Sequence, residues 1–123
     1  MLGRILLTLG ALVLIGTAAL HGSGAQMVAG WLGGERGLLL QTLWFIPVLD
    51  WATVALVWLF IAWRGDSRLG PLVWLLALVP GGAAAMVAAS VGPYFVGVWL
   101  LAGATLLALL GSIALPRVGA PAD

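Results

Sequence analysis

The stretch that decides the fold is Leu38–Trp63, which reads LLLQTLWFIPVLDWATVALVWLFIAW. Its only charged side chain is that of Asp50. A helix of this length extends about 39 Å at about 1.5 Å per residue, which exceeds the roughly 30 Å thickness of a bilayer's hydrocarbon layer. The stretch therefore predicts a membrane-spanning helix, with the excess length taken up by tilt or by a kink at Pro47.

Three more apolar stretches, Leu2–Leu20, Pro71–Ala89 and Tyr94–Leu115, flank this helix. Each is close to the roughly 20 residues that a helix needs to cross a bilayer, and backbone in lipid must satisfy its hydrogen bonds within a helix. The chain is 63% hydrophobic and only 7% charged, against about 25% charged in soluble domains. We therefore expect one all-α domain over residues 1–123, a polytopic membrane protein with four transmembrane helices in an antiparallel up-down bundle.

The N-terminus also has the features of a signal peptide. A short basic start, an apolar run and small residues at Ser23–Ala25 would fit cleavage after Ala25. We expect the segment to be retained as the first helix.

The arginines predict the orientation. Arg4, Arg64, Arg68 and Arg117 fall on one side of the four predicted spans, and Arg36 falls on the other. Cytoplasmic loops carry the excess of basic residues, so both termini are expected to be cytoplasmic. All basic residues are Arg, and Ala, Gly, Leu and Val dominate, which is typical of a GC-rich bacterial genome and places the chain in a bacterial inner membrane. A net charge of +1 gives no indication of a nucleic-acid partner.

The three predicted connections differ in length. Ser90–Pro93 is tight and predicts an antiparallel hairpin, and Arg64–Gly70 is a short polar turn. His21–Gly37 is the longest and contains six Gly around an apolar centre. It could form a short helix in the outer interface, a lid over the bundle, or an ordinary linker.

Asp50 is the most distinctive candidate site residue, with Thr53 one turn further and Gln41 also inside the span. A charged side chain at mid-membrane costs about 2.5–3.5 kcal/mol on insertion scales. It could be a carboxylate coupled to proton or cation transport. Alternatively, it could be a protonated structural residue, hydrogen-bonded to an indole, to Thr53 or to a carbonyl freed by Pro47. No basic residue lies at its depth, so an ion-pair partner would have to come from another subunit.

Aromatic side chains and one histidine suggest a ligand site. Trp44, Trp51 and Trp58 recur every seven residues on one side of the second span, in a stripe that could pack, contact lipid or hold a flat apolar molecule. His21, the only histidine, follows the first span as an interfacial residue or a single axial ligand. The residues do not identify a cofactor: none is required by the sequence, and a lipid, a quinone or a pigment is possible.

Small residues form stripes along the other helices. Apolar burial does not drive association in lipid, so close backbone approach over small residues must supply the packing. We therefore expect helix contacts at Gly10, Thr17, Gly81, Gly97, Ala104 and Gly111. At least one stripe, on the first or the fourth helix, is predicted to meet a second chain, either a copy or another membrane subunit.

The residues favour a non-enzymatic role. The chain has no Cys, which excludes thiolate chemistry, and its spans offer too few convergent polar groups for catalysis or a metal site. We expect an accessory or structural subunit of a larger membrane complex, or a binder of an apolar ligand. The alternative is a minimal proton- or cation-coupled transporter or channel oligomer that uses Asp50.

The orientation can be tested with alkaline-phosphatase fusions, because the enzyme is active only outside the cytoplasm. We expect a fusion after Gly34 to be active and a fusion after Ser67 to be inactive. The reverse pattern would contradict the assignment of both termini to the cytoplasm.

Overall fold

The computed structural model describes residues 1–116, and within them the chain is helical with no strand. The elements are α1 (Leu2–Ser23), α2 (Ala25–Leu32), α3 (Gly34–Arg64), the 3-10 turn η1 (Ser67–Leu69), α4 (Gly70–Ser90) and α5 (Val96–Ile113). Four helical segments are long and apolar enough to cross a membrane: α1 with α2, α3, η1 with α4, and α5. The predicted class, an all-α four-helix membrane protein, is confirmed.

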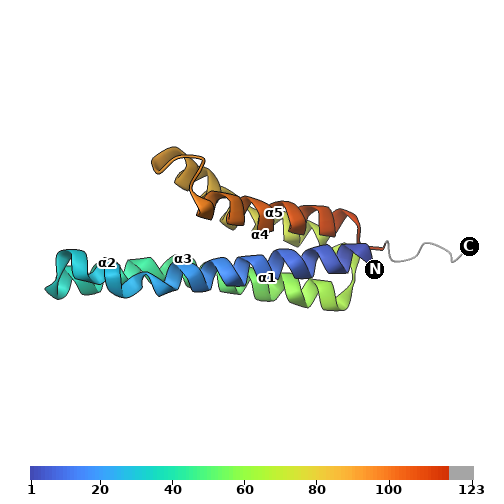
Figure 1. Cartoon of the computed structure of the whole chain (residues 1–123). Helices are drawn as coiled ribbons and strands as arrows, with labels where there is room; N and C mark the ends of the chain where they lie inside the picture. Colours follow the sequence, from blue (N-terminus) through green and yellow to red (C-terminus); the bar gives the residue numbers. More distant parts are fainter. Residues whose placement is uncertain (117–123) are drawn as a thin grey trace, which may run out of the picture.

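The connection His21–Gly37, for which a short helix, a lid and a linker were the alternatives, is mostly helix. α1 continues to Ser23, Gly24 keeps helical dihedrals, and α2 follows directly. Figure 1 shows α2 extending the line of α1 beside α3, rather than covering the bundle as a lid. The actual turn is at Gly33 and Gly34, with φ of 64° and 50°, values that favour glycine. The helices of the first two spans therefore extend beyond Leu20 and Leu38, because most glycines of this segment lie inside helices.

The helices form two antiparallel hairpins. α1 packs against α3 on one side and α5 on the other, α4 packs mainly against α5, and α3 touches α4 sparsely. The first hairpin is long and straight, and α3 runs through Pro47 as one helix. In Figure 1 the α4–α5 connection turns away from α3. Pro80, which lies inside α4 and precedes Gly81 and Gly82, weakens that helix because proline cannot donate the hydrogen bond of its turn.

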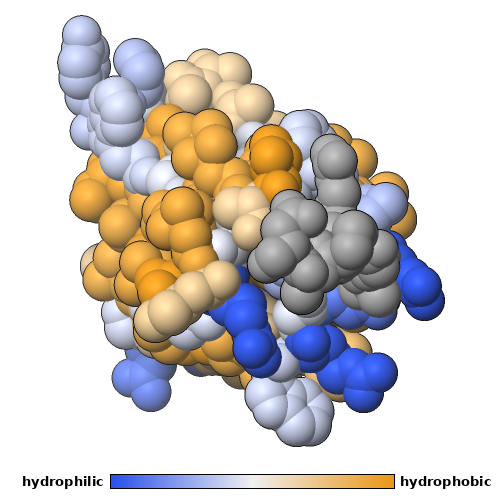
Figure 2. Space-filling model, turned by 90° about the vertical axis from the view of Figure 1, so that its right-hand side faces the viewer, coloured by the Kyte–Doolittle hydropathy of each residue, from blue (hydrophilic) through white to orange (hydrophobic). Residues whose placement is uncertain are grey.

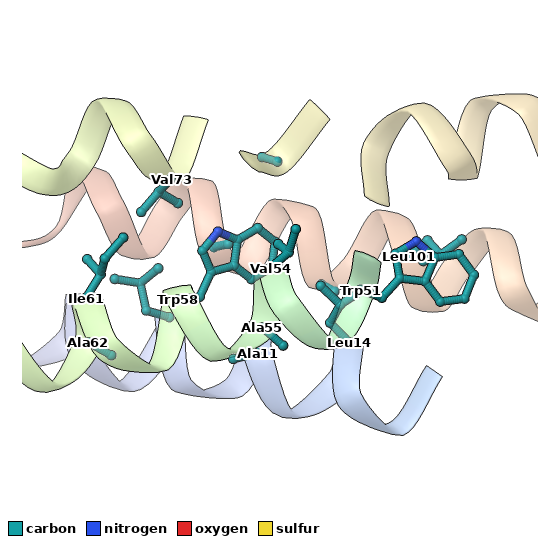
Figure 3. Close-up of a cluster of buried hydrophobic side chains, with 14 of the residues drawn as sticks. Ala11, Leu14, Trp51, Val54, Ala55, Trp58, Ile61, Ala62, Val73 and Leu101 are labelled. Atoms are coloured by element: carbon teal, nitrogen blue, oxygen red, sulfur yellow. The ribbon is translucent and has the colours of Figure 1, made fainter. Parts of the chain in front are cut away.

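The core lies where α1, α3 and α5 meet. Trp51, Trp58 and Ile61 of α3 point into it, and Val73 of α4 lies beside the last two (Figure 3). Leu7 and Leu14 of α1 complete it and are fully buried. Their spacing of seven keeps one face of α1 toward its neighbours.

Glycines let the backbones of α1 and α5 come into direct contact. A Cβ atom at Gly3 would lie 2.6 Å from the Ala114 backbone, and one at Gly10 would lie 2.9 Å from the Ala104 carbonyl oxygen. From the opposite helix, a Cβ at Gly111 would lie 2.7 Å from the Leu7 backbone nitrogen. The small-residue stripes of the first and fourth spans thus pack against each other within one chain.

The other predicted packing positions also have neighbours within the chain. Thr17 and Ala104 are buried, Gly81 faces the Thr105 side chain, and Gly97 lies under the Phe95 ring. Because the stripes are occupied within the chain, they no longer support contact with a second chain. Association of chains itself stays a prediction.

A side chain joins α1 to α3 at the basic end of the bundle, the end that holds Arg4, Arg64 and Arg68. The Arg4 guanidinium donates to the Ala62 carbonyl oxygen at 2.7 Å and to the Trp63 carbonyl oxygen. These carbonyls belong to the last turn of α3, where the helix leaves acceptors unpaired and favours positive charge. Figure 2 shows hydrophilic side chains gathered at this end.

Four of the five arginines can be located in the structure. Arg4, Arg64 and Arg68 share the basic end, and Arg36 lies at the opposite end, in the first turn of α3. Arg117 lies outside the described residues. The side of the membrane that each end faces stays a prediction.

Glycine-to-alanine changes at two positions of α1 test the contact with α5. Gly10→Ala should destabilise the fold by about 1–3 kcal/mol, because the added methyl group overlaps backbone. At Gly16 a Cβ would meet nothing within 4 Å, so Gly16→Ala should stabilise the helix by about 0.5–1 kcal/mol. Thermal unfolding in detergent micelles measures both, and equal effects would contradict the contact.

Candidate functional site

A cavity of about 420 Å³ lies at the end of the bundle opposite the arginines of the basic end. We call it the His21 cavity. Thr17 and His21 of α1 and Trp44 of α3 line one side, and Val87 of α4 and Leu100 of α5 line the other. It lies between the straight hairpin and the α4–α5 connection that turns away from it (Figure 1). Its lining is mainly apolar.

An aromatic cluster forms the α1–α3 side of this cavity. The rings of His21 and Trp44 stack with centroids 4.2 Å apart and planes 6° apart, and Trp51 meets His21 edge-on at 5.2 Å. The Trp44 Nε1 donates to the His21 carbonyl oxygen at 2.7 Å. Stacking and hydrogen bonding together hold the Trp44 ring against His21.

His21, predicted as an interfacial residue or a single axial ligand, packs against the aromatic cluster. It lies in the last turn of α1, is partly buried against two indole rings, and has a buried Nε2 without a hydrogen-bond partner in residues 1–116. In that part of the chain no group of three His, Asp or Glu side chains is arranged to hold a metal ion. His21 therefore places a ring nitrogen without a hydrogen-bond partner beside a mainly apolar space.

The three tryptophans of the stripe have two different environments. Trp44 and Trp51 line the His21 cavity, whereas Trp58 is fully buried in the core. The Trp58 Nε1 is also buried and has no partner among the described residues. The stripe therefore packs at one end and borders a cavity at the other.

Asp50 and Thr53 lie away from the cavity. Both are exposed on α3, and neither lines the His21 cavity. Asp50 makes no side-chain hydrogen bond within residues 1–116, so the internal bonds required by the structural alternative are not observed. The transport alternative would need a pathway between chains, because Asp50 borders no cavity described here. Gln41 is partly buried and does not line the His21 cavity.

A second, more open groove of about 340 Å³ lies between α1 and α3 near the basic end. Arg4, Thr8 and Leu59 are among its lining residues. Its two polar side chains are already engaged, since Arg4 bonds to α3 and the Thr8 hydroxyl donates to the Arg4 carbonyl. The groove therefore offers little for recognition.

No family model matches this chain, and no curated protein or solved structure matches it either. The functional argument therefore rests on the geometry of the site.

Sequence reasoning identified the α1 and α3 side of the cavity but missed the opposite side. Val87, Phe95 and Leu100 line the cavity and carry no pattern that separates them from lipid-facing residues. The available signal was Pro80–Gly82, whose composition allows α4 to bend.

Trp44→Phe tests the hydrogen bond that orients the aromatic cluster. Phenylalanine retains a ring for stacking but cannot donate to the His21 carbonyl, so unfolding free energy should fall by about 0.5–1.5 kcal/mol. Trp99→Phe, at a position that is 65% exposed, is the matched control and should change little. Thermal unfolding followed by circular dichroism measures both, and equal shifts would contradict an anchoring role for Trp44.

Proposed function

We propose that this small multi-pass membrane protein binds an apolar ligand in the His21 cavity without changing it chemically. The observation that carries the proposal is the cavity itself, which is bordered by an ordered aromatic cluster. Its volume of about 420 Å³ lies within the roughly 300–1,000 Å³ typical of small-molecule sites. Such sites combine apolar walls with few polar groups, a description that fits His21 among Trp44, Trp51 and aliphatic side chains.

A ligand of this site must compete with lipid chains, which are equally apolar. Selectivity must therefore come from shape and from the aromatic surfaces, because hydrophobicity alone does not distinguish a ligand from its solvent. Flat rings stack favourably on indole and imidazole faces. A quinone, a pigment or a rigid lipid suits these walls better than a saturated acyl chain.

Filling the cavity tests the proposal. Val87 lines it and is partly buried, whereas the adjacent Met86 is 72% exposed and is not among the lining residues. Val87→Phe should occupy the space and lower binding of a dansyl-labelled sterol, a rigid lipid, about tenfold, equivalent to about 1.4 kcal/mol. Met86→Phe adds a similar ring outside the cavity and should leave binding unchanged.

The measurement is energy transfer from tryptophan to the dansyl group in detergent micelles. Mass spectrometry of an organic extract of the purified protein shows what the cavity holds after purification from its native membrane. Equal binding by both variants, or no bound apolar compound and no energy transfer in the unmodified protein, would contradict the proposal.

A further inference from the structure

Two polar side chains near the middle of α3 are exposed inside the predicted membrane layer. Asp50 and Thr53 are both exposed there. Asp50 lies 14 residues from Arg64 and 16 from Gly34, the two ends of α3. At about 1.5 Å per residue, a layer of about 30 Å includes Asp50 wherever it is placed along the helix. Lipid cannot supply the hydrogen bonds that these groups make in water.

Thr53 also differs from the other threonines of the described chain. Thr8, Thr17, Thr42 and Thr105 each donate to the carbonyl four residues earlier in their own helix. Thr53 makes no side-chain hydrogen bond within residues 1–116. This face therefore presents a carboxyl acceptor and a hydroxyl donor side by side, both without partners in that part of the chain.

We propose that this face, the Asp50 face, is the contact surface between two copies of this chain, with Thr53 of each copy donating to Asp50 of the other. Residues three apart are separated by about 60° around a helix. Asp50 and Thr53 therefore lie about 30° to either side of a line that runs along the helix surface midway between them. When these lines of the two copies face each other across a two-fold axis, Asp50 of each copy lies opposite Thr53 of the other. The same symmetry keeps the two carboxyl groups apart.

A second copy also matches the depth of these groups. In two copies inserted in the same orientation, Asp50 of one copy and Thr53 of the other differ in depth by three residues, about 4.5 Å at about 1.5 Å per residue, an offset that two side chains reaching toward each other can span. The arginines of the described chain lie near helix ends, so a second copy presents no arginine at mid-helix. Thr53 therefore provides the donor that the carboxyl group needs. Exposed Ile46 and Leu49 provide the surrounding apolar contact.

Disulfide cross-linking tests this contact directly, because the chain contains no cysteine. Ile46 lies one turn before Asp50, near the centre of the predicted contact, and Met86 is an exposed position on α4. In liposomes at low protein-to-lipid ratio, Ile46→Cys should form a disulfide-linked dimer on mild oxidation. Met86→Cys, the control, should stay monomeric.

Second-site changes test whether the polar pair holds the dimer. In the Ile46→Cys background, Asp50→Leu and Thr53→Val should each lower the dimer yield about tenfold, the change expected for a polar contact between membrane helices. Asp50→Asn should retain it, because an amide also accepts from the threonine. Circular dichroism checks that each variant is folded, and Thr53→Val keeps the test valid if Asp50→Leu fails to fold.

Several outcomes would overturn the proposal. They are equal cross-linking of Ile46→Cys and Met86→Cys, a monomer in every case, dimer yields that neither polar change lowers, and cross-linking of Ile46→Cys in native membranes only to a different protein. The proposal does not depend on the His21 cavity, so Val87→Phe should leave the dimer intact and the two ideas can fail separately.

Discussion

The direct backbone contact between α1 and α5 is the interaction on which the rest of the structure depends. Gly3, Gly10 and Gly111 leave no room for a Cβ atom between the two helices. In lipid, contact of this kind must supply the packing energy, because burying one apolar side chain against another removes no water. α1 is thereby held between α5 and α3, and it joins the two hairpins of the bundle.

This arrangement also explains why the His21 cavity forms at the end opposite the arginines. Near the basic end α4 contacts the core, where Val73 packs among the buried residues, and Arg4 joins α1 to the end of α3. Beyond Pro80 the α4–α5 connection turns away from α3 (Figure 1). α1 and α3 still run side by side there, so His21, Trp44 and Trp51 remain packed together and border the space that α4 leaves open.

Most polar side chains in the spans form hydrogen bonds with the helical backbone. Most hydroxyl groups return a hydrogen bond to their own helix, which satisfies the donor without a partner helix. The Arg4 guanidinium serves carbonyls at a helix end. Asp50 and Thr53, on the exposed face of α3, depart from this pattern. Their position away from the cavity separates the surface proposed for chain association from the site proposed for the ligand.

The sequence by itself determined the class of fold. Four apolar stretches of membrane-spanning length leave the backbone no alternative to helices, since lipid offers it no hydrogen bonds. Gly10 and Thr17, two of the predicted packing residues, are seven residues apart, and such spacing keeps residues on one side of a helix.

Tertiary structure decided which partner each face meets. It paired the stripes of α1 and α5 within one chain, continued helix through most of His21–Gly37, and placed Asp50 on the exposed face of α3. A helical repeat specifies a face but not its neighbour, and the neighbour depends on the packing of all four helices. The His21 cavity depends on the same packing, since its walls come from α1, α3, α4 and α5, and no local pattern records the space between them.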